Sequence, residues 1–412
     1  MAKKGNIIIG QSGGPTPVIN CSLYGIISEA KKYGFEKIIG MINGIEGVLK
    51  EELIDLKCEK EETLESIKMT PGAALGSCRY MLNTEDPSDP NIKRIFEVFS
   101  KHDIRYFFYI GGNDSMDTAD KINKAAQKAG YDLRVIGIPK TVDNDLVGTD
   151  HCPGFGSAVK YVATSVMEAG LHTESMYTSE PVTILVTVGR NTGWLPAASA
   201  LARRDEIDAP HLIYFPEIPF SIEKFLVDVQ STYEKFGGVF IVTGEGLVDS
   251  NGSYLTARTS DVATDSFGHP ELGGVGDYLK HIIEDKLGLR TRCIKLDICQ
   301  QSAMHFASQT DVLEAALAGR AAVDYALEGK SGYMVAFERE PGDVYRLRTG
   351  LVELSRVANS ERKVPRQWIN EEGNFPTQEF LSYVRPLIQG EVSINIKEGL
   401  PVYTRLRKKR IK

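Results

Sequence analysis

Lys140, Asp143 and Asp145 stand close together in the stretch PKTVDND (139–145), directly after an apolar run. Two aspartates separated by one residue are usually part of a turn, but here a lysine and a threonine hydroxyl accompany them. Phosphoryl transfer to an alcohol needs a base for the hydroxyl, an anchor for Mg²⁺ and a cation that meets the transferring group. The stretch therefore contains the residue types that this chemistry requires.

Glycine-rich turns follow two other apolar runs, in GQSGGPTPVIN (10–20) and in GGNDS (111–115). Gly13 and Gly14 precede a helical pattern, and such turns hold anions because backbone N–H groups and the helix N-terminus point at the ligand. Neither turn has the spacing of a dinucleotide-binding or Walker motif. Asp114 adds a carboxylate to the second turn, where a phosphate would be expected.

Two further loops carry charged side chains. Arg190 stands in VGRNTGWL, and Glu245 stands in TGEG. An arginine can hold a phosphate through two hydrogen bonds, and a glutamate can accept hydrogen bonds from sugar hydroxyls. Arg79 and Arg292 add two more basic side chains in predicted loops. Each of these residues would be an ordinary surface residue if it occurred singly.

The elements that must position these loops alternate between strand and helix. Short apolar runs predict strands at 6–10, 37–41, 106–110, 135–139, 182–189, 211–215 and 238–246. Helical spacing of apolar residues recurs at 16–32, 92–101, 115–129, 155–170, 193–203, 221–235, 274–286 and 309–328. This alternation predicts an α/β fold of two Rossmann-like lobes, with mainly parallel sheets covered by helices. Ligands of such sheets bind outside the carboxyl ends of the strands, where the glycine turns fall.

A chain of 412 residues is too long for one hydrophobic core, so we expect two domains. The polar loop 142–156 is the predicted crossing between them. We assign residues 1–150 with about 300–345 to one lobe and about 151–299 to the other. Residues from about 346 to 412 form a predicted C-terminal extension packed on the body.

Composition excludes several classes of protein. The first apolar run, Ile7–Ile9, is too short for a signal peptide, and no segment reaches the length of a membrane span, so we expect a cytoplasmic protein. The six cysteines show no CxxC spacing and are interpreted as reduced structural thiols. A net charge of −7 argues against nucleic-acid binding, and the basic end 405–412 is interpreted as a solvated tail.

Taken together, the motifs resemble those of the 6-phosphofructokinase family, in the family's order. They are SGG (12–14), LGSCR (75–79), GGNDS (111–115), PKTVDND (139–145), VGRNTGW (188–194) and GEG (244–246). The family's ATP-dependent members have glycine at the positions of Asp114 and Lys140, whereas its pyrophosphate-dependent members have aspartate and lysine, as this chain does.

The resemblance implies reversible, Mg²⁺-dependent transfer of a phosphoryl group from pyrophosphate to the C1 hydroxyl of fructose 6-phosphate. The products would be fructose 1,6-bisphosphate and phosphate, a reaction of glycolysis. Asp114 would occupy the place of a nucleotide's α-phosphate and so repel ATP. Lys140 would stabilise the phosphoryl groups, Asp143 would accept the hydroxyl proton, and Arg79 would reach the transferring group.

By the same resemblance, the first lobe would bind the donor and the second the sugar phosphate. The residues expected at the donor are Gly13, Gly14, Gly112, Asn113 and Ser115. The residues expected at the acceptor are Thr141, Val142, Asp143, Asp145, Val188, Gly189, Arg190, Glu245, Arg292 and Gln300. The metal would be held by Asn113, Asp114 and Asp145.

Four positions depart from the family's pattern. Asn113 stands where many relatives have a metal-binding aspartate, and Val188 replaces a common methionine. Gln301 stands where the family usually has an arginine that faces fructose 6-phosphate. Pro181 falls near the position of an arginine that a neighbouring subunit often supplies.

The resemblance also implies a homodimer or homotetramer in which a neighbouring chain contributes a basic residue such as Arg292. Three alternatives stay open at this point. The chain could be an ATP-dependent sugar-phosphate kinase, it could accept further sugars such as sedoheptulose 7-phosphate, or it could be a catalytically silent sugar-phosphate sensor.

Overall fold

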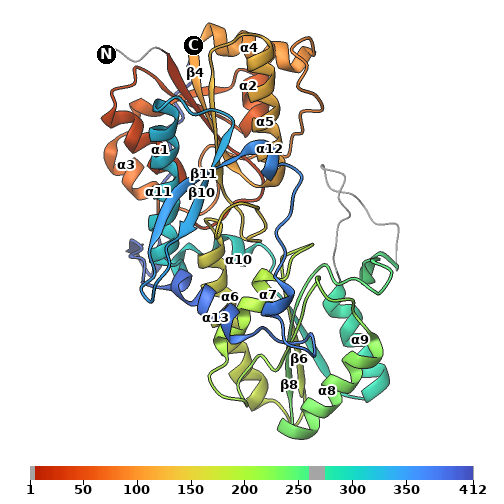
Figure 1. The fold of residues 1–412 in the computed structure, drawn as a ribbon. Coiled ribbons are helices and arrows are strands. Elements are labelled where there is room, and N and C mark those ends of the chain that lie inside the picture. The colour runs from red at the N-terminus through yellow and green to blue at the C-terminus, as the bar shows by residue number, and fades with distance from the viewer. Residues whose placement is uncertain (1–4, 259–273, 412) are drawn as a thin grey trace. The chain divides into compact units, whose positions relative to one another are not determined.

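The computed structural model describes residues 5–258 and 274–411 and divides the chain into two compact units. Unit 1 comprises Met1–Phe155, Gln301–Glu361 and Gly390–Lys412, and unit 2 comprises Gly156–Gln300 and Arg362–Gln389. Each unit has a sheet of mainly parallel strands with helices packed on it (Figure 1). The predicted α/β class is therefore confirmed.

The sheet of unit 1 has seven strands in the order β11-β10-β5-β4-β1-β2-β3. They are β1 (Asn6–Gln11), β2 (Ile38–Met41), β3 (Leu53–Asp55), β4 (Ile104–Gly111), β5 (Arg134–Pro139), β10 (Tyr333–Arg339) and β11 (Leu347–Glu353). The inner strands are parallel, while β3 and β11 run antiparallel to their neighbours at the two edges.

Both faces of this sheet are buried, which explains why its inner strands are apolar at almost every position. Ile7 and Ile9 point to one face and Ile8 to the other, where each joins a separate hydrophobic cluster. The first face is covered by α1 (Ile19–Lys32), α3 (Glu61–Ile67) and α11 (Gln309–Leu327). The second is covered by α2 (Gly44–Leu49), α4 (Pro90–Lys101), α5 (Asn113–Lys128) and α12 (Leu354–Val357).

The sheet of unit 2 has four parallel strands in the order β7-β8-β6-β9. They are β6 (Val182–Thr187), β7 (Leu212–Tyr214), β8 (Val239–Gly244) and β9 (Thr291–Lys295). Helices α8 (Ile222–Phe236) and α9 (Val275–Leu287) share one hydrophobic cluster with these strands. The unit also contains α6 (Phe155–Ser175), which begins at the last residue of unit 1, and α7 (Trp194–Ala198), while α10 (Cys299–Ser302) begins in unit 2 and ends in unit 1.

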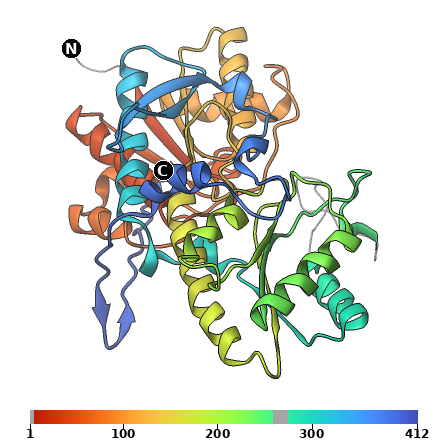
Figure 2. The same cartoon turned by 60° about the horizontal axis from the view of Figure 1, so that its bottom comes forward.

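The C-terminal part of the chain is shared between the units rather than forming a region of its own. Residues 362–389, with α13 (Gln378–Val384), belong to unit 2, where Trp368 and Tyr383 pack on Trp194 with ring centroids 6.0 and 5.7 Å away. Residues 390–412 return to unit 1. They include a short hairpin of β12 (Ile396–Lys397) and β13 (Leu400–Pro401), drawn in dark blue in Figure 2.

In the part of the tail that the structure describes, the basic side chains are exposed, as predicted, but the backbone of the tail is paired with unit 1. Arg410 forms an antiparallel bridge with Ile54, and the carbonyl of Lys409 accepts a hydrogen bond of 2.9 Å from the N–H of Asp55. Leu406 is buried in the cluster beside α1. An edge strand exposes unpaired backbone groups, so the tail covers β3 and completes that edge.

Among the described residues, we find no helix that combines the length and the apolar character needed to cross a bilayer.

Helices α1 and α11 approach closely at two glycines. A methyl group at Gly319 would lie 2.2 Å from the carbonyl oxygen of Ser22, and one at Gly25 would lie 2.2 Å from that of Ala316. Replacing Gly319 with alanine should therefore destabilise the protein by roughly 1–3 kcal/mol, even though alanine favours a helix by about 1 kcal/mol. A lower urea midpoint at unchanged slope would show this.

The exposed face of α11 provides the control for this substitution. Leu313 is 56% exposed, and Leu313→Ala should change stability by no more than about 0.5 kcal/mol. A Gly319→Ala variant that is as stable as the wild type, or more stable, would contradict the close approach of the two helices.

Candidate active site

Three loops of unit 1 follow neighbouring parallel strands, so their residues lie at one edge of the sheet. The loop 10–14 follows β1, the loop 111–115 follows β4, and the loop 140–145 follows β5. Hydrogen bonds join them, because the N–H of Lys140 donates to the carbonyl of Gly111 at 3.1 Å. The structure therefore brings together the donor residues that the sequence predicted.

Lys140 lies at the centre of this edge and is only 3% exposed. Its ammonium group donates to the carbonyl of Gly14 at 2.7 Å. The pKa of Lys140 is lowered to about 8, mainly by burial and in smaller part by the charge of Arg79, while Asp143 and Asp145 act in the opposite direction. Arg79, Asp143 and Asp145 therefore lie close enough to Lys140 for their charges to change its pKa.

The turn at Gly13 needs glycine for two reasons. Its φ of +74° is one that other residues rarely adopt, and a methyl group there would lie 3.1 Å from the Lys140 ammonium nitrogen. The loop that carries Arg79 docks on this turn, because the N–H of Gly13 donates to the carbonyl of Cys78 at 3.1 Å. The hydroxyl of Ser77 also donates to the carbonyl of Gly13 at 2.5 Å.

Asp114 lies in the first turn of α5, whose N-cap is Gly112. A carboxylate at this position is favourable for the helix itself, because the N-terminal N–H groups carry partial positive charge. The same end of a helix is also where a phosphate binds. Ser115 is 3% exposed beneath the turn, and a methyl group at Gly111 would lie 2.0 Å from its hydroxyl. The carboxylate and an anionic ligand would thus compete for one site.

Asn113 and Asp145 are the pair that best fits a divalent cation. The Asn113 amide donates to Oδ2 of Asp145 at 3.0 Å, and the Oδ1 atoms of both residues are buried without a hydrogen-bond partner. Burial raises the pKa of Asp145, and the nearby Glu361 adds to this effect. No cluster of three or more His, Cys, Asp or Glu side chains suitable for a metal exists in the described part of the chain. Mg²⁺ commonly binds through one or two carboxylates and keeps several waters.

The 140–145 loop is shaped by hydrogen bonds within unit 1. The N–H of Asp143 donates to the hydroxyl of Thr141 at 3.0 Å, and Val142 is buried with 5% exposure. Asn144 adopts a left-handed conformation with φ of 55°. The backbone therefore turns sharply between the two aspartates.

In unit 2, the loops after β6 and β8 lie side by side because these strands are parallel neighbours. A methyl group at Gly246 would lie 1.5 Å from the carbonyl oxygen of Arg190, so the two loops touch at a glycine. Burial raises the pKa of Glu245, and the charge of Arg190 partly offsets this. Arg190 and Glu245 are therefore brought together, as the sequence predicted.

Gln300 and Gln301 take different positions. Gln300 is fully buried, its carbonyl oxygen accepts from the N–H of Val188 at 3.3 Å, and its amide donates to the carbonyl of Asp297 at 2.9 Å. In unit 1, the amide oxygen of Gln301 lies 3.2 Å from the place that a methyl group at Gly14 would occupy. Gln301 thus lies beside the first glycine turn.

Arg292 does not join Arg190 and Glu245 within its unit. It pairs in register with Thr183 near the start of β6, at the amino end of the sheet, and its side chain forms an ion pair with Glu180. Val188 lies five residues further along the strand direction, or roughly 16 Å at 3.3 Å per residue. If Arg292 binds an acceptor, that acceptor is therefore not the one that Arg190 of the same chain binds.

Glu217 is a residue that sequence reasoning missed. Its Oε1 atom accepts from the N–H groups of Gly193 and Val364, both at 2.9 Å, so it fixes the end of the loop that carries Arg190. Burial raises the pKa of Glu217. The only signal in the sequence is a carboxylate shortly after a predicted strand.

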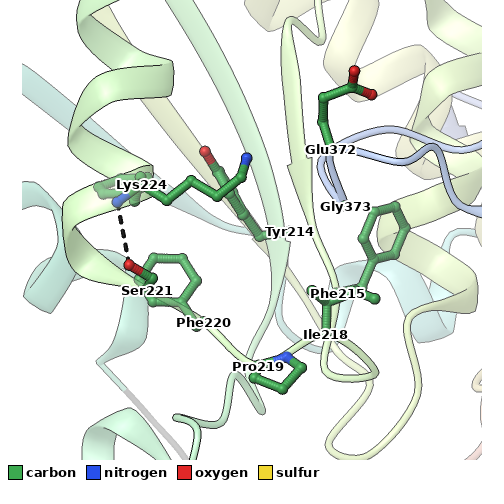
Figure 3. Close-up of a pocket in the computed structure, with 10 residues that line it drawn as sticks. Tyr214, Phe215, Ile218, Pro219, Phe220, Ser221, Lys224, Glu372 and Gly373 are labelled. Carbon is green, nitrogen blue, oxygen red and sulfur yellow. Dashed lines mark hydrogen bonds between the residues drawn. The ribbon is translucent and has the colours of Figure 1, made fainter.

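A pocket with an empty volume of about 310 Å³ lies at the carboxyl end of β7 (Figure 3). Tyr214, Phe220 and Phe225 line it and pack on one another with ring centroids 5.3 to 5.4 Å apart. The N–H of Lys224 donates to the hydroxyl of Ser221 at 3.2 Å, the dashed line in Figure 3. None of the predicted site residues lines this pocket.

Two α/β units carry at their strand ends a buried lysine, carboxylates and an arginine–glutamate pair, the residue types that phosphoryl transfer to an alcohol requires. The chain belongs to the phosphofructokinase family, since the sequence model described as Phosphofructokinase matches residues 6–326.

Relatives of known name cover nearly the whole chain. Pyrophosphate–fructose 6-phosphate 1-phosphotransferase of Xanthomonas campestris is 42% identical over 98% of this chain and 96% of its own length. Sulfofructose kinase of Alkalicoccus urumqiensis is 36% identical over 89% of this chain and 92% of its own. The crystal structure of a pyrophosphate-dependent phosphofructokinase from Marinobacter aquaeolei matches with a TM-score of 0.88 and 41% identity, covering 99% of this chain and 97% of that one.

Proposed function

We propose that this chain is a pyrophosphate-dependent 6-phosphofructokinase, which transfers a phosphoryl group reversibly from pyrophosphate to the C1 hydroxyl of fructose 6-phosphate. The observation that carries the proposal is the pair Asp114 and Lys140 at one sheet edge, with Lys140 buried against Gly14. A nucleotide would have to place its α-phosphate against the Asp114 carboxylate, whereas pyrophosphate has no such group. The full-length relatives that carry this activity in their names support the same conclusion.

Unit 1 binds the donor in this proposal. The N–H groups of the turns around Gly14 and Gly112 donate hydrogen bonds to the phosphate oxygens, and Lys140 and Arg79 supply positive charge. Because Lys140 is buried, its charge acts in a medium of low dielectric and stabilises the transferring phosphoryl group more strongly than it would in water.

Asp143 removes the proton from the C1 hydroxyl as the new bond to phosphorus forms. The bridging oxygen of pyrophosphate leaves with the second phosphate, so inorganic phosphate is released. In unit 2, Arg190 and Glu245 bind the acceptor, and Gln300 acts on it indirectly by holding the N–H of Val188. Thr141 fixes the backbone of Asp143 through its hydroxyl.

Members of this family use a divalent metal, and we assign Mg²⁺ to the oxygens of Asn113 and Asp145. When bound, the ion neutralises the negative charge of the phosphates. It would also satisfy the two buried Oδ1 atoms that lack hydrogen-bond partners. Asp114, which follows Asn113, is close enough in sequence to hold a water of the ion.

A coupled assay with fructose 6-phosphate tests the proposal, with pyrophosphate and then ATP as the donor, and with and without a chelator. We expect a rate with pyrophosphate that is lost on removal of the metal and restored by Mg²⁺. A rate with ATP alone would make the chain an ATP-dependent kinase. Binding of the sugar phosphate without turnover would make it a sensor. Sedoheptulose 7-phosphate and sulfofructose are tested as further acceptors, since one relative is named after the latter.

We also propose a cytoplasmic homodimer or homotetramer in which Arg292 reaches the acceptor of a neighbouring chain. Arg292→Ala should raise the KM for fructose 6-phosphate about tenfold with little change in kcat, because it removes a charge that binds the ground state and the transition state equally. Arg290→Ala, at an exposed arginine two residues earlier, is the matched control. Sedimentation of an active monomer would exclude this assembly.

A further inference from the structure

The chain returns alongside the 140–145 loop a few residues after leaving it. We call residues 149–154 the return segment. The N–H of Thr141 donates to the carbonyl of Pro153 at 3.2 Å, and the N–H of Cys152 donates to the side chain of Asn144 at 3.0 Å. These two contacts lie on either side of Asp143. The position of Asp143 therefore depends on where the return segment is held.

His151 holds the return segment through both nitrogens of its ring. Nδ1 lies 2.8 Å from the carboxylate of Asp150, and Nε2 lies 2.8 Å from that of Glu314 on α11. A carboxylate can only accept, so both nitrogens carry a proton and the imidazole is cationic. Burial alone would lower the pKa of His151, but Glu314 and Asp150 outweigh it and raise the pKa to about 9.

A second layer of contacts fixes these two carboxylates. Arg339 donates to Asp150 at 2.9 Å, and the hydroxyl of Tyr345 donates to Glu314 at 2.5 Å. The His151 ring also packs on Phe337, with ring centroids 5.0 Å apart. The cluster thus ties the return segment to β10, to α11 and to the turn between β10 and β11. Its two cations, His151 and Arg339, balance its two carboxylates, Asp150 and Glu314.

We propose that His151 is a positioning residue that fixes Asp143 by clamping the return segment between Asp150 and Glu314. The inference rests on the proposed function, in which Asp143 is the base. His151 has no place in the motifs that the sequence singled out, and it lies eight residues beyond Asp143. It acts through Asn144 and Thr141 rather than on the substrates.

The clamp loosens when His151 loses its second proton. A neutral imidazole has one N–H, so one of the two buried carboxylates loses its donor, which is costly. The pKa of His151 is higher in the folded protein than in the unfolded chain. The stabilisation that the His151 charge gives to the fold is therefore complete below about pH 6.5 and is lost as the pH rises through about 9. Loss of the Lys140 proton near pH 8 already lowers kcat, so we expect kcat to fall more steeply above pH 9, while the protein remains folded.

The test replaces His151 with glutamine, which keeps one donor and cannot become cationic. At pH 7.5 we expect kcat with pyrophosphate to fall about 10- to 100-fold, the cost of a small misplacement of a catalytic group. The KM values should change by no more than about twofold, and the additional loss of kcat above pH 9 should disappear, while the loss near pH 8 that comes from Lys140 stays. His211→Gln is the matched control, because His211 is equally buried but holds β8 in unit 2 through the N–H of Phe240. The proposal would be overturned if His151→Gln and His211→Gln lost the same fraction of kcat while losing the same amount of stability.

Amide hydrogen exchange provides a readout that does not depend on activity. The N–H groups of Thr141 and Cys152 should exchange faster in His151→Gln than in the wild type, while those of β6 stay unchanged. Unchanged exchange at Thr141 and Cys152 would overturn the clamp even if activity fell. If the wild type itself showed no turnover with pyrophosphate, the proposed function would fail, and the exchange data would still decide whether His151 holds the loop.

Discussion

Asp143→Asn should lower kcat by about 10² to 10⁴-fold, the usual contribution of a positioned base. The amide keeps the shape of the side chain but cannot take the proton of the C1 hydroxyl. The backbone should not move, since Asp143 is held through its N–H by the hydroxyl of Thr141. Steady-state kinetics measure the loss of kcat.

Two measurements separate this effect from misfolding. The thermal midpoint of Asp143→Asn and its calorimetric affinity for fructose 6-phosphate should both stay close to those of the wild type. Asp132→Asn, at a surface aspartate paired with Arg134, is the control for a change of net charge and should leave kcat unchanged. A rate near that of the wild type in Asp143→Asn would remove Asp143 from its role as the base.

Asp114→Gly should lower the KM for ATP and reduce the use of pyrophosphate at the same time. The substitution removes the carboxylate from the first turn of α5, so the N-terminal N–H groups of the helix become available to the α-phosphate of a nucleotide. The helix should lose only about 0.3–1 kcal/mol from the missing charge. Measuring kcat/KM for both donors shows whether the ratio has shifted toward ATP.

Lys140→Gly should behave differently from Asp114→Gly. It removes positive charge at the transferring group without opening space for a nucleotide, so kcat with pyrophosphate should fall and little should be gained with ATP. The double variant should use ATP best of the three variants. In the proposed function both residues face one phosphate position, so their effects should not add. A ratio of donors that Asp114→Gly leaves unchanged would contradict this account of donor choice.

The sequence predicted the strands that carry the site because both faces of each sheet are covered. A strand such as Asn6–Gln11 is buried along its whole length, contains the apolar run Ile7–Ile9 and leads into a glycine turn, so both its place and its end can be predicted. Strands β3, β9 and β11 at sheet edges escaped prediction, as did the inner strand β10, whereas the edge strand β7 was predicted at 211–215. Thr291–Lys295 has only two apolar residues, Cys293 and Ile294, between polar ones, and Leu53–Asp55 is too short for a pattern. Local sequence does not show that a tail will cover such an edge.

Residues that we propose to act on the ligand stand out in the sequence more clearly than residues that hold other residues in place. Lys140, Asp143 and Arg190 stand in loops directly after strands, where charged side chains are informative. Glu217 and His151 stabilise these loops from elsewhere in the chain, and their contacts with Val364 and Glu314 join positions that are distant in sequence. The burial of Lys140 against Gly14 likewise depends on the register of two strands.

The reverse reaction tests the central claim most directly. Fructose 1,6-bisphosphate, inorganic phosphate and Mg²⁺ are mixed with the enzyme, and the products are followed by phosphorus NMR. The account predicts that pyrophosphate and fructose 6-phosphate appear together, in equal amounts, without any nucleotide. It would be contradicted if no pyrophosphate formed and the bisphosphate were consumed only after ADP was added, with ATP as the product.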